Sequence, residues 1–230
     1  MFKFIISILS LVSLQVIASS KVSQTLTEQI AIRKTNSSKK MSLSVKREFQ
    51  RAIKELKARG IEKNSIQKGV HVPSFNLENR RFKSFYKKYP IVLKFYRGSW
   101  CPYCQLEMKD YEKYKSKIES KGYKLIVLTP DTKLEIRKFR KRQEISFPIF
   151  QDKDNHIAKK FGIAFKLDKK VTEIYKGFGI DLAKNQNNLL NEIPMPGTYV
   201  INKKGIITFT FVDADYTKRL DPLDLLKVLK

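Results

Sequence analysis

The only two cysteines of this chain, Cys101 and Cys104, are separated by two residues, and their setting constrains the fold more than any other feature. Directly before them, residues 91–96 form an apolar, aromatic-rich segment that predicts a buried strand. Directly after them, residues 105–121 carry apolar side chains at helical spacing, namely Leu106, Met108, Tyr111, Tyr114 and Ile118. The sequence therefore predicts a Cys-x-x-Cys pair at the point where a strand turns into a helix.

This placement favours redox chemistry at the cysteine pair. The first turn of a helix presents free backbone N–H groups and the positive end of the helix dipole. A thiolate at Cys101 is stabilised in that position, so we expect its pKa to fall below the value of about 8.5 of a free thiol. Pro102 suits the first helical position, where a backbone N–H has no helical partner. The thiol of Cys104 can then react with an oxidised Cys101, and the product is a redox-active Cys101–Cys104 disulfide.

Two other uses of a Cys-x-x-Cys pair have to be weighed. A zinc site needs four ligands, and the only histidines, His71 and His156, are far from the pair and from each other in the sequence. We therefore predict no metal site. A structural disulfide remains open, although so short a ring constrains little of the unfolded chain. The strand before the pair and the helix after it favour a working redox pair.

Composition bears on the partners of the protein rather than on its fold. The 230 residues suffice for one domain with additions, or at most two. They include 47 basic and 22 acidic residues, which gives a net charge of +25. This balance predicts either a lysine-rich solvated surface or a non-specific attraction to anionic surfaces. No motif of a nucleic-acid-binding module is present, and no haem, flavin or nucleotide motif is visible, so we predict no cofactor beyond the cysteine sulfurs.

Residues 1–20 have the pattern of a signal peptide. Lys3 supplies a positive charge, residues 4–17 are apolar, and Ala18-Ser19-Ser20 suits a cleavage site. We expect the mature protein to be exported, either to a periplasm or out of the cell. The alternative is an uncleaved segment that anchors the protein in a membrane, although the apolar run is short for a membrane span.

Residues 21–68 are predicted to form an N-terminal helical extension. Within it, residues 35–40 predict a loop, because they are polar and rich in Asn and Ser. Residues 44–59 predict an amphipathic helix that ends at Gly60, with one apolar face formed by Val45, Phe49, Ile53 and Leu56. A segment of this length buries too little apolar surface to fold alone, so we expect it to pack on the main domain.

The middle of the chain alternates strands and helices. A second buried strand is predicted at residues 124–129, and a helix capped by Asp131 or Thr132 is predicted to run to about Arg142. A strand, a helix, a strand and a helix at this spacing imply parallel strands joined by right-handed crossovers.

The last third of the chain is less regular. Residues 163–197 yield only one assignment, an exposed loop at 185–188. Residues 198–201 and 206–212 predict a β-hairpin. A final helix is predicted from Pro222 onward, with an apolar face formed by Leu223, Leu226 and Leu229.

This order of elements around a Cys-x-x-Cys pair resembles the thioredoxin fold, and Trp100 directly before the first cysteine strengthens the resemblance. Residues 195–201 are similar to the segment in which that superfamily places a cis-proline facing the cysteines. The resemblance makes Pro196 the candidate for this proline and adds Thr198, two residues later, as a supporting residue.

Several motifs narrow the resemblance to one family. Residues 69–77 resemble the G-x-x-x-P-x-F-x-L opening of peroxiredoxins, and residues 147–163 resemble their F-P-x-x-x-D and A-x-x-F-G motifs. Residues 95–104 and 211–219 are similar to the peroxiredoxin-like branch of the alkyl hydroperoxide reductase/thiol-specific antioxidant family. The resemblance covers the chain from about residue 45 onward. It implies an α/β, thioredoxin-like fold in residues 69–230, with a central mixed β-sheet flanked by helices.

The chain departs from that family at the reactive site. Peroxiredoxins carry P-x-x-x-T-x-x-C, in which the cysteine attacks peroxide; here Arg97 takes the proline position and Cys101 the threonine position. The family also places an arginine before the late strand, where this chain has none, so Arg97 is the candidate to supply a guanidinium. The resemblance to peroxiredoxins makes Cys104 the attacking residue, and the resemblance to thioredoxins makes it Cys101. The argument from the helix start favours Cys101.

Three functions are compatible with the sequence. The first is a thiol-dependent peroxide reductase, an antioxidant enzyme whose disulfide is reduced by a thioredoxin-like or other dithiol. The second is an exported thiol–disulfide oxidoreductase that acts on protein disulfides, as the Trp-Cys-Pro-Tyr-Cys motif and the absent peroxiredoxin residues suggest. The third is a basic, non-enzymatic binding protein of the cell envelope. We expect the first.

Overall fold

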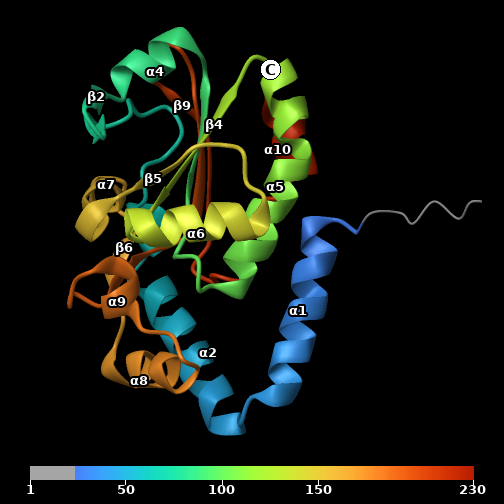
Figure 1. Ribbon diagram of the computed structural model, residues 1–230, viewed down its shortest axis with the longest axis vertical. Coiled ribbons are helices and arrows are strands. Elements are labelled where there is room, and N and C mark those ends of the chain that lie inside the picture. Colours follow the sequence, from blue (N-terminus) through green and yellow to red (C-terminus); the bar gives the residue numbers. More distant parts are fainter. Residues whose placement is uncertain (1–23) are drawn as a thin grey trace, which may run out of the picture.

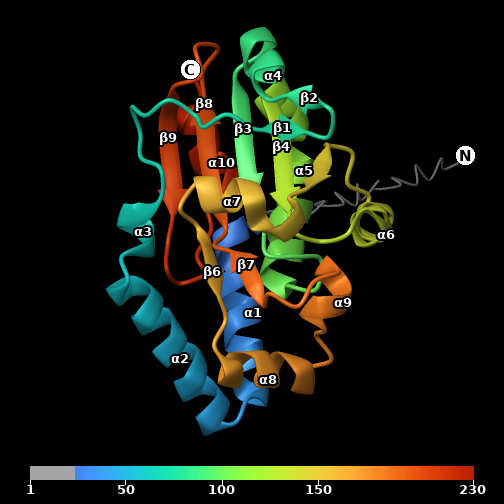
Figure 2. The same ribbon diagram turned by 90° about the vertical axis from the view of Figure 1, so that its left-hand side faces the viewer.

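The computed structural model describes residues 24–230, so the predicted signal peptide at 1–20 lies outside the described residues. At its centre is a five-stranded sheet with the strand order β5-β4-β3-β8-β9. Its strands lie side by side in Figure 2. They are β3 (Ile91–Phe95), β4 (Lys124–Thr129), β5 (Ile149–Gln151), β8 (Gly197–Ile201) and β9 (Ile207–Val212).

The sheet is mixed, as predicted. β3 pairs in parallel with β4, and β4 pairs in parallel with β5. The connecting helices are α5 (Pro102–Ser120) and α6 (Lys133–Gln143). Thr132, one of the two predicted caps, begins α6 by accepting a hydrogen bond from the backbone N–H of Glu135. The predicted hairpin of β8 and β9 completes the sheet, and β8 adds to β3 in the antiparallel sense.

The sheet is apolar on both faces because helices cover both. On β3, Val92 belongs to the core on the side of α5 and α10 (Pro222–Val228), whereas Leu93 belongs to the core on the opposite side. The helices α4 (Lys83–Lys88) and α7 (His156–Lys160) contribute to this opposite core, and α7 lies in front of the sheet in Figure 2. Both cysteines belong to the core on the α5 side, so the candidate site lies between the sheet and α5.

Two helices, α1 (Leu26–Lys40) and α2 (Leu43–Ala58), precede the sheet and meet at one end of the molecule (Figure 1). The helix predicted at 44–59 is confirmed as α2. The loop predicted at 35–40 is wrong, because α1 continues through these residues. The division of the chain at residues 68 and 69 stays a prediction.

The packing of its first turns explains why α1 forms despite its polar sequence. A capping box of Thr25 and Glu28 begins the helix. Leu26 and Ile30 are buried in the core on the α5 side. Once these residues anchor the helix, each further residue adds a hydrogen bond, and the weak helix propensity of the Asn and Ser residues is overridden.

Short elements complete the fold. They are α3 (Ile61–Asn64), β1 (Asn76–Leu77), β2 (Arg80–Arg81), η1 (Lys153–Asn155), β6 (Ala164–Lys166), α8 (Lys169–Gly177), α9 (Leu182–Gln186) and β7 (Glu192–Pro194). The segment 163–197 thus contains two helices and an antiparallel β6–β7 pair. The exposed loop predicted at 185–188 is wrong in its first half, because α9 includes Gln186, which is buried.

The last helix begins at Pro222 as predicted, but its buried face differs. Leu225 and Leu229 are buried, whereas Leu223 is 38% exposed. Asp221 caps the helix and also accepts a hydrogen bond from the backbone N–H of Thr27 in α1. This second contact joins the start of α10 to α1, and Leu225 rather than Leu223 faces the core.

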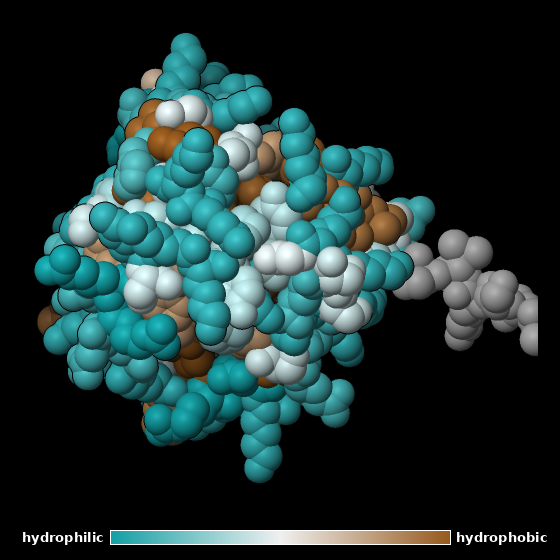
Figure 3. All heavy atoms as spheres, turned by 90° about the horizontal axis from the view of Figure 1, so that it is seen from above, coloured by the Kyte–Doolittle hydropathy of each residue, from teal (hydrophilic) through white to brown (hydrophobic). Residues whose placement is uncertain are grey.

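The face of the molecule seen from above is largely hydrophilic. In the view from above in Figure 3, hydrophilic side chains cover most of the face, and hydrophobic side chains form small separate groups. Among the helices of residues 24–230, none has both the length and the apolar character needed to cross a bilayer.

Candidate active site

The cysteine pair stands at the junction of β3 and α5, as the sequence predicted. Cys101 is the N-cap of α5, and Pro102 is the first residue of the helix. Cys104 follows within the first turn, and the two side chains share a hydrogen bond. Both residues are free thiols and both are buried; Cys101 is 1% exposed. The pair is therefore poised to form a disulfide across a single helical turn.

The pKa values of the two thiols are shifted in opposite directions. Burial by itself would raise the pKa of Cys101, but the hydrogen bond with Cys104 and the charges of Arg97 and Arg219 outweigh burial and lower this pKa to about 6. Burial and the neighbouring Cys101 sulfur raise the pKa of Cys104 well above that of a free thiol. Near neutral pH, Cys101 therefore carries the thiolate and Cys104 keeps its proton.

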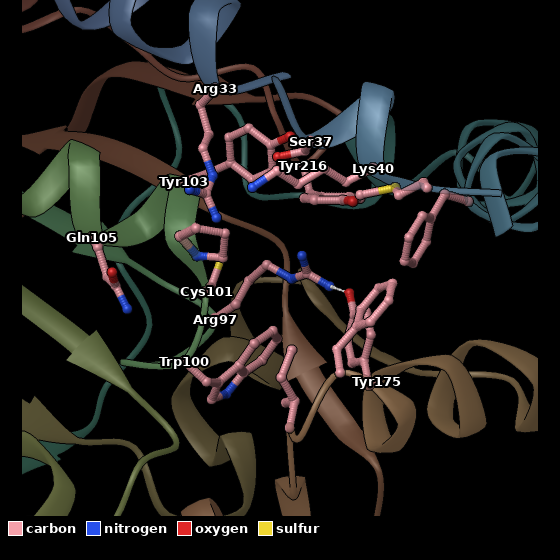
Figure 4. Close-up of a pocket in the computed structure, with 15 residues that line it drawn as sticks. Arg33, Ser37, Lys40, Arg97, Trp100, Cys101, Tyr103, Gln105, Tyr175 and Tyr216 are labelled. Atoms are coloured by element: carbon pink, nitrogen blue, oxygen red, sulfur yellow. Dashed lines mark hydrogen bonds between the residues drawn. The ribbon is translucent and has the colours of Figure 1, made fainter. Parts of the chain in front are cut away.

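Arg97 follows β3 and points between Cys101 and Tyr175 (Figure 4). Its side chain is buried and donates a hydrogen bond to the hydroxyl of Tyr175. The ring centroid of Tyr216 lies 4.1 Å from the guanidinium carbon. Burial by itself would lower the pKa of Arg97, but Tyr175 and Cys101 raise it. The guanidinium therefore stays charged, and it lies on the side of Cys101 that faces a cavity.

A second group of buried charges lies beside Cys104, on the side of the core. Nη2 of Arg219 is 3.5 Å from the sulfur of Cys104, and Nε of Arg219 is 2.8 Å from Oε2 of Glu107. The other carboxylate oxygen of Glu107 is 2.9 Å from Nζ of Lys94. Lys94 in turn donates a 2.6 Å hydrogen bond to Thr198, its partner across the β3–β8 ladder. We call these residues the Lys94–Glu107–Arg219 network.

This network was not predicted from the sequence, although two of its residues stand out there. Lys94 is the only charged residue in the apolar segment 91–96. Glu107 follows Cys104 by three residues, which places both side chains on one face of a helix. Arg219 could not be assigned, because it is 115 residues away from Cys104 in the chain.

A cavity of about 430 Å³ opens above Cys101. Aromatic and basic side chains form its wall, and they come from α1, α2, α8 and the segment between β9 and α10 (Figure 4). Trp100, a predicted supporting residue, lies in this wall, with its ring 5.3 Å from the ring of Tyr175. The cavity provides a path by which a small molecule can reach Cys101.

Pro196, the candidate for a cis-proline, does not have a cis bond in this structure. Within residues 24–230 no peptide bond is cis, so the bond before Pro196 is trans. Pro194 pairs with Ala164, and the N–H of Met195 donates to the carbonyl of Ile163. The chain therefore runs on in an extended conformation from β7 into β8, and Pro196 is not among the residues that line the cavity.

The loop that carries Cys101 is held by a buried acid. Oδ2 of Asp131 accepts a 2.6 Å hydrogen bond from the backbone N–H of Ser99, and burial raises the pKa of Asp131 to about 7. Gly98 has a φ of +152°, and a Cβ at this position would meet Trp100 at 2.2 Å and Asp131 at 2.8 Å. Only glycine fits this position, because the backbone runs so close to both side chains.

The two histidines lie away from the cysteine pair and its cavity. Among residues 24–230, no group of three or more His, Cys, Asp or Glu side chains is arranged to hold a metal ion. His71 forms an isolated β-bridge with Ile206, and His156 begins α7. Neither histidine lines the cavity above Cys101.

Comparisons with known proteins place this chain in a family. Residues 68–210 match the AhpC/TSA family. The chain is 29% identical over 128 residues to the thiol-disulfide oxidoreductase ResA of Bacillus thuringiensis, and the match covers 50% of this chain and 73% of that protein. It is 25% identical over 160 residues to peroxiredoxin Q of Triticum aestivum, with 66% of this chain and 62% of that protein covered.

A solved structure shows the same fold. Peroxidoxin BcpB of Mycobacterium tuberculosis superposes with a TM-score of 0.54 at 18% sequence identity, and the match covers 71% of this chain and 96% of that one. The family match includes β3, the cysteine pair and the whole of α5. The protein is therefore a thiol-based oxidoreductase that belongs to the AhpC/TSA family, whose peroxiredoxin-like members its sequence resembles.

Proposed function

We propose that the protein is a thiol-dependent peroxide reductase in which Cys101 attacks the peroxide and Cys104 resolves the product. The observation that carries this proposal is the lowered pKa of Cys101, to about 6, beside the buried guanidinium of Arg97. A thiolate is the reactive form of cysteine, and a fixed cation next to it can stabilise the charge that develops on the departing oxygen.

The reaction follows from the protonation states of the two thiols. The Cys101 thiolate attacks the terminal oxygen of the hydroperoxide, the O–O bond breaks, and the alkoxide leaves as an alcohol, or as water from hydrogen peroxide, after taking up a proton. Cys101 becomes a sulfenic acid. The Cys104 sulfur then attacks the Cys101 sulfur, so that an S–S bond forms and one water leaves. An external dithiol reduces the disulfide and becomes oxidised itself.

Arg219 contributes to the second step, in which Cys104 attacks the sulfenic acid. It donates a hydrogen bond to the Cys104 sulfur over 3.5 Å. This bond stabilises negative charge on Cys104 when that thiol loses its proton to attack the sulfenic acid. We assign Arg219 as a positioning and charge-stabilising residue for resolution, and Arg97 as the corresponding residue for the attack on peroxide.

A disulfide reductase is the second candidate. The Trp-Cys-Pro-Tyr-Cys motif and the similarity to ResA favour it. The burial of Cys101 argues against a disulfide reductase, because its sulfur lies at the inner end of a cavity that α1 and α2 cover. A small hydroperoxide can enter this cavity, whereas a disulfide on the surface of a folded protein reaches the sulfur only if these helices move.

The kinetics of oxidation separate the two functions. We would add one equivalent of hydrogen peroxide to the fully reduced protein and follow thiol loss by stopped flow. The peroxidase proposal predicts second-order oxidation at least a hundredfold faster than that of a free thiol with the same pKa, and loss of this rate in Cys101→Ser. Oxidation at the rate of a free thiol, together with fast exchange with protein disulfides, would establish the second candidate instead.

We also propose that residues 1–20 direct export and that a thioredoxin-like dithiol reduces the Cys101–Cys104 disulfide. The first proposal rests on the signal-peptide pattern of the sequence, and the second on the kind of reaction that this family performs. The mass of the protein recovered from its native compartment tests export, because cleavage after Ala18 or Ser20 removes the entire apolar segment.

A further inference from the structure

The cavity above Cys101 continues between the two N-terminal helices. A second cavity, of about 470 Å³, lies between α1 and α2 and shares five lining residues with the first: Ser37, Met41, Phe49, Tyr103 and Tyr216. We call the two together the hairpin groove. It leads from Cys101 to Ile53 and Lys57 on α2. Both helices precede residue 68, so the groove is built largely from a part of the chain that lies outside the family match.

The floor of the hairpin groove is aromatic along its length. The ring centroid of Phe49 lies 6.0 Å from that of Tyr175 and 6.5 Å from that of Tyr216. Tyr216 in turn lies 5.9 Å from Tyr103. Met41, at the C-terminal end of α1, and Ile53, on α2, extend this apolar surface. A concave apolar surface of this size, with a few polar groups at its ends, is typical of a ligand site.

The rim of the hairpin groove is basic. Its cations are Arg33, Lys34, Lys40, Lys46, Lys54 and Lys57. Among the described residues, Asp215 is the only acid that lines either cavity, and it pairs with Lys34 at 3.2 Å. No acidic group of residues 24–230 lies within ion-pair distance of Lys46 or Lys54. The outer half of the groove therefore favours an anionic group above its apolar floor.

At the inner end of the hairpin groove, the Arg97 guanidinium lies beside the Cys101 thiolate and keeps a hydrogen-bond donor without a partner. Arg97 is 2% exposed, and its Nε has no hydrogen-bond partner in the described chain. No carboxylate of residues 24–230 pairs with it. Because a buried N–H donor without a partner is costly, the free Nε–H of this guanidinium favours an oxygen acceptor beside Cys101.

We propose that the hairpin groove selects long-chain hydroperoxides that carry a free carboxylate, as fatty-acid hydroperoxides do. This inference rests on the peroxidase function proposed above. The peroxide group lies between Cys101 and Arg97, the apolar chain lies on the aromatic floor, and the carboxylate reaches Lys46 and Lys54. The Cys101 thiolate takes the terminal oxygen, the O–O bond breaks, and the hydroxy fatty acid leaves after its alkoxide has taken up a proton. The sulfur supplies the two electrons and becomes a sulfenic acid.

The substrate preference tests the proposal directly. We would compare the rate constants for oxidation of Cys101 by three forms of one long-chain hydroperoxide: the free acid, its methyl ester, and a phospholipid ester in neutral vesicles. The proposal predicts that the free acid reacts about tenfold faster than the methyl ester and faster still than the phospholipid. Equal rates for the acid and either ester would overturn it, because the carboxylate would then not be recognised.

Charge reversal locates the carboxylate. In Lys46→Glu/Lys54→Glu, we expect the ratio of the acid rate to the ester rate to fall about tenfold, since two attractive charges become repulsive. The matched control is Lys203→Glu/Lys204→Glu, which changes the net charge equally in the exposed turn between β8 and β9. If the control lowers the ratio as much as the groove variant does, the effect belongs to the overall charge of the protein and the proposal fails.

Binding of the non-peroxidic parent acid separates this proposal from the peroxidase function. Trp100 is the only tryptophan and lines the groove, so its fluorescence reports on occupancy without any redox step. One outcome is saturable binding that weakens in Lys46→Glu/Lys54→Glu, while no hydroperoxide oxidises the protein faster than it oxidises a free thiol. This outcome would support the binding site and refute the peroxidase function. Absence of binding, in a protein that reduces hydrogen peroxide rapidly, would refute the site and retain the peroxidase.

Discussion

At the scale of single residues, two guanidinium groups flank the cysteine pair from opposite sides. Arg97 lies on the side of the cavity, and Arg219 lies on the side of the core, 3.5 Å from the Cys104 sulfur. Both charges act on Cys101, which also shares a hydrogen bond with Cys104. The thiolate therefore forms on Cys101, whose sulfur faces the cavity and can be reached by a substrate.

The reactivity of Cys101 should follow its lowered pKa. Because the thiolate is the nucleophile, we expect the rate of alkylation by iodoacetamide in Cys104→Ser, which keeps a hydrogen-bond donor beside Cys101, to rise through a pKa that stays below the free-thiol value of about 8.5. In Cys104→Ser/Arg97→Gln the loss of a nearby cation should move this midpoint upward, because the charged form loses a stabilising interaction. A midpoint that does not change on removal of Arg97 would show that its guanidinium does not stabilise the thiolate.

Asp131 should make folding stability depend on pH. Burial raises the pKa of this acid to about 7 in the folded protein, whereas an unfolded chain titrates near 3.9. Between these two values the folded state binds more protons, so Asp131 lowers the stability as the pH rises from about 4 to about 7. We therefore expect Asp131→Asn to become more stable than the wild type over this interval, by on the order of 2–4 kcal/mol at its upper end.

Urea unfolding at a series of pH values measures this difference. The change should be confined to the interval between the two pKa values. A constant difference between variant and wild type at all pH values would mean that the pKa of Asp131 is the same in the folded and unfolded protein.

At the scale of secondary-structure elements, the Lys94–Glu107–Arg219 network joins three parts of the chain. Lys94 comes from β3, Glu107 from α5 and Arg219 from the segment that leads into α10. All three side chains are buried, and Glu107 is the only acid of the network. The network thus fixes the position of the helix that carries Cys104 relative to the sheet.

Loss of Glu107 should be strongly destabilising. In Glu107→Gln, Lys94 and Arg219 would be buried without a carboxylate, and we expect a loss of about 3–5 kcal/mol in the free energy of unfolding. Glu119→Gln is the matched control on the same helix, because Glu119 forms a partly exposed pair with Lys115 and should cost less than about 1 kcal/mol. Equal losses in the two variants would mean that Glu107 does not balance the buried cations.

The anchoring of α1 can be tested in the same way. Leu26 is fully buried under the first turn of the helix, whereas Ile32 of the same helix is 47% exposed. We expect Leu26→Ala to lower the free energy of unfolding by about 2–4 kcal/mol, and Ile32→Ala to change it by less than about 0.5 kcal/mol. Thermal unfolding monitored by circular dichroism measures the stability of both variants. If Leu26→Ala has no more effect than Ile32→Ala, then α1 does not depend on this contact for its docking.

At the scale of the whole molecule, the features that depend on local pattern could be predicted from the sequence. The order of strands and helices from residue 91 to residue 143 follows from apolar periodicity, a cap at Thr132 and short connections. The cysteine pair at the start of α5 follows from the same pattern. These features are encoded within a few residues of where they occur.

The features that depend on distant contacts could not be predicted. The continuation of α1 past residue 35 depends on contacts of its first turns with the core, and the network beside Cys104 depends on Arg219, which is more than a hundred residues away. The expectation for Pro196 rested on a family resemblance, and here the chain continues from β7 into β8 with a trans bond. The hairpin groove requires two helices and a later tyrosine, Tyr216, to come together.

The measurement that tests the central claim most directly is the identity of the cysteine that peroxide oxidises. We would treat reduced Cys104→Ser and Cys101→Ser with one equivalent of hydrogen peroxide in the presence of dimedone, which traps sulfenic acids, and map the adduct by mass spectrometry. We predict a rapid, near-complete adduct on Cys101 in the first variant and none on Cys104 in the second. An adduct on Cys104 alone would contradict the assignment, and no adduct in either variant would contradict the peroxidase itself.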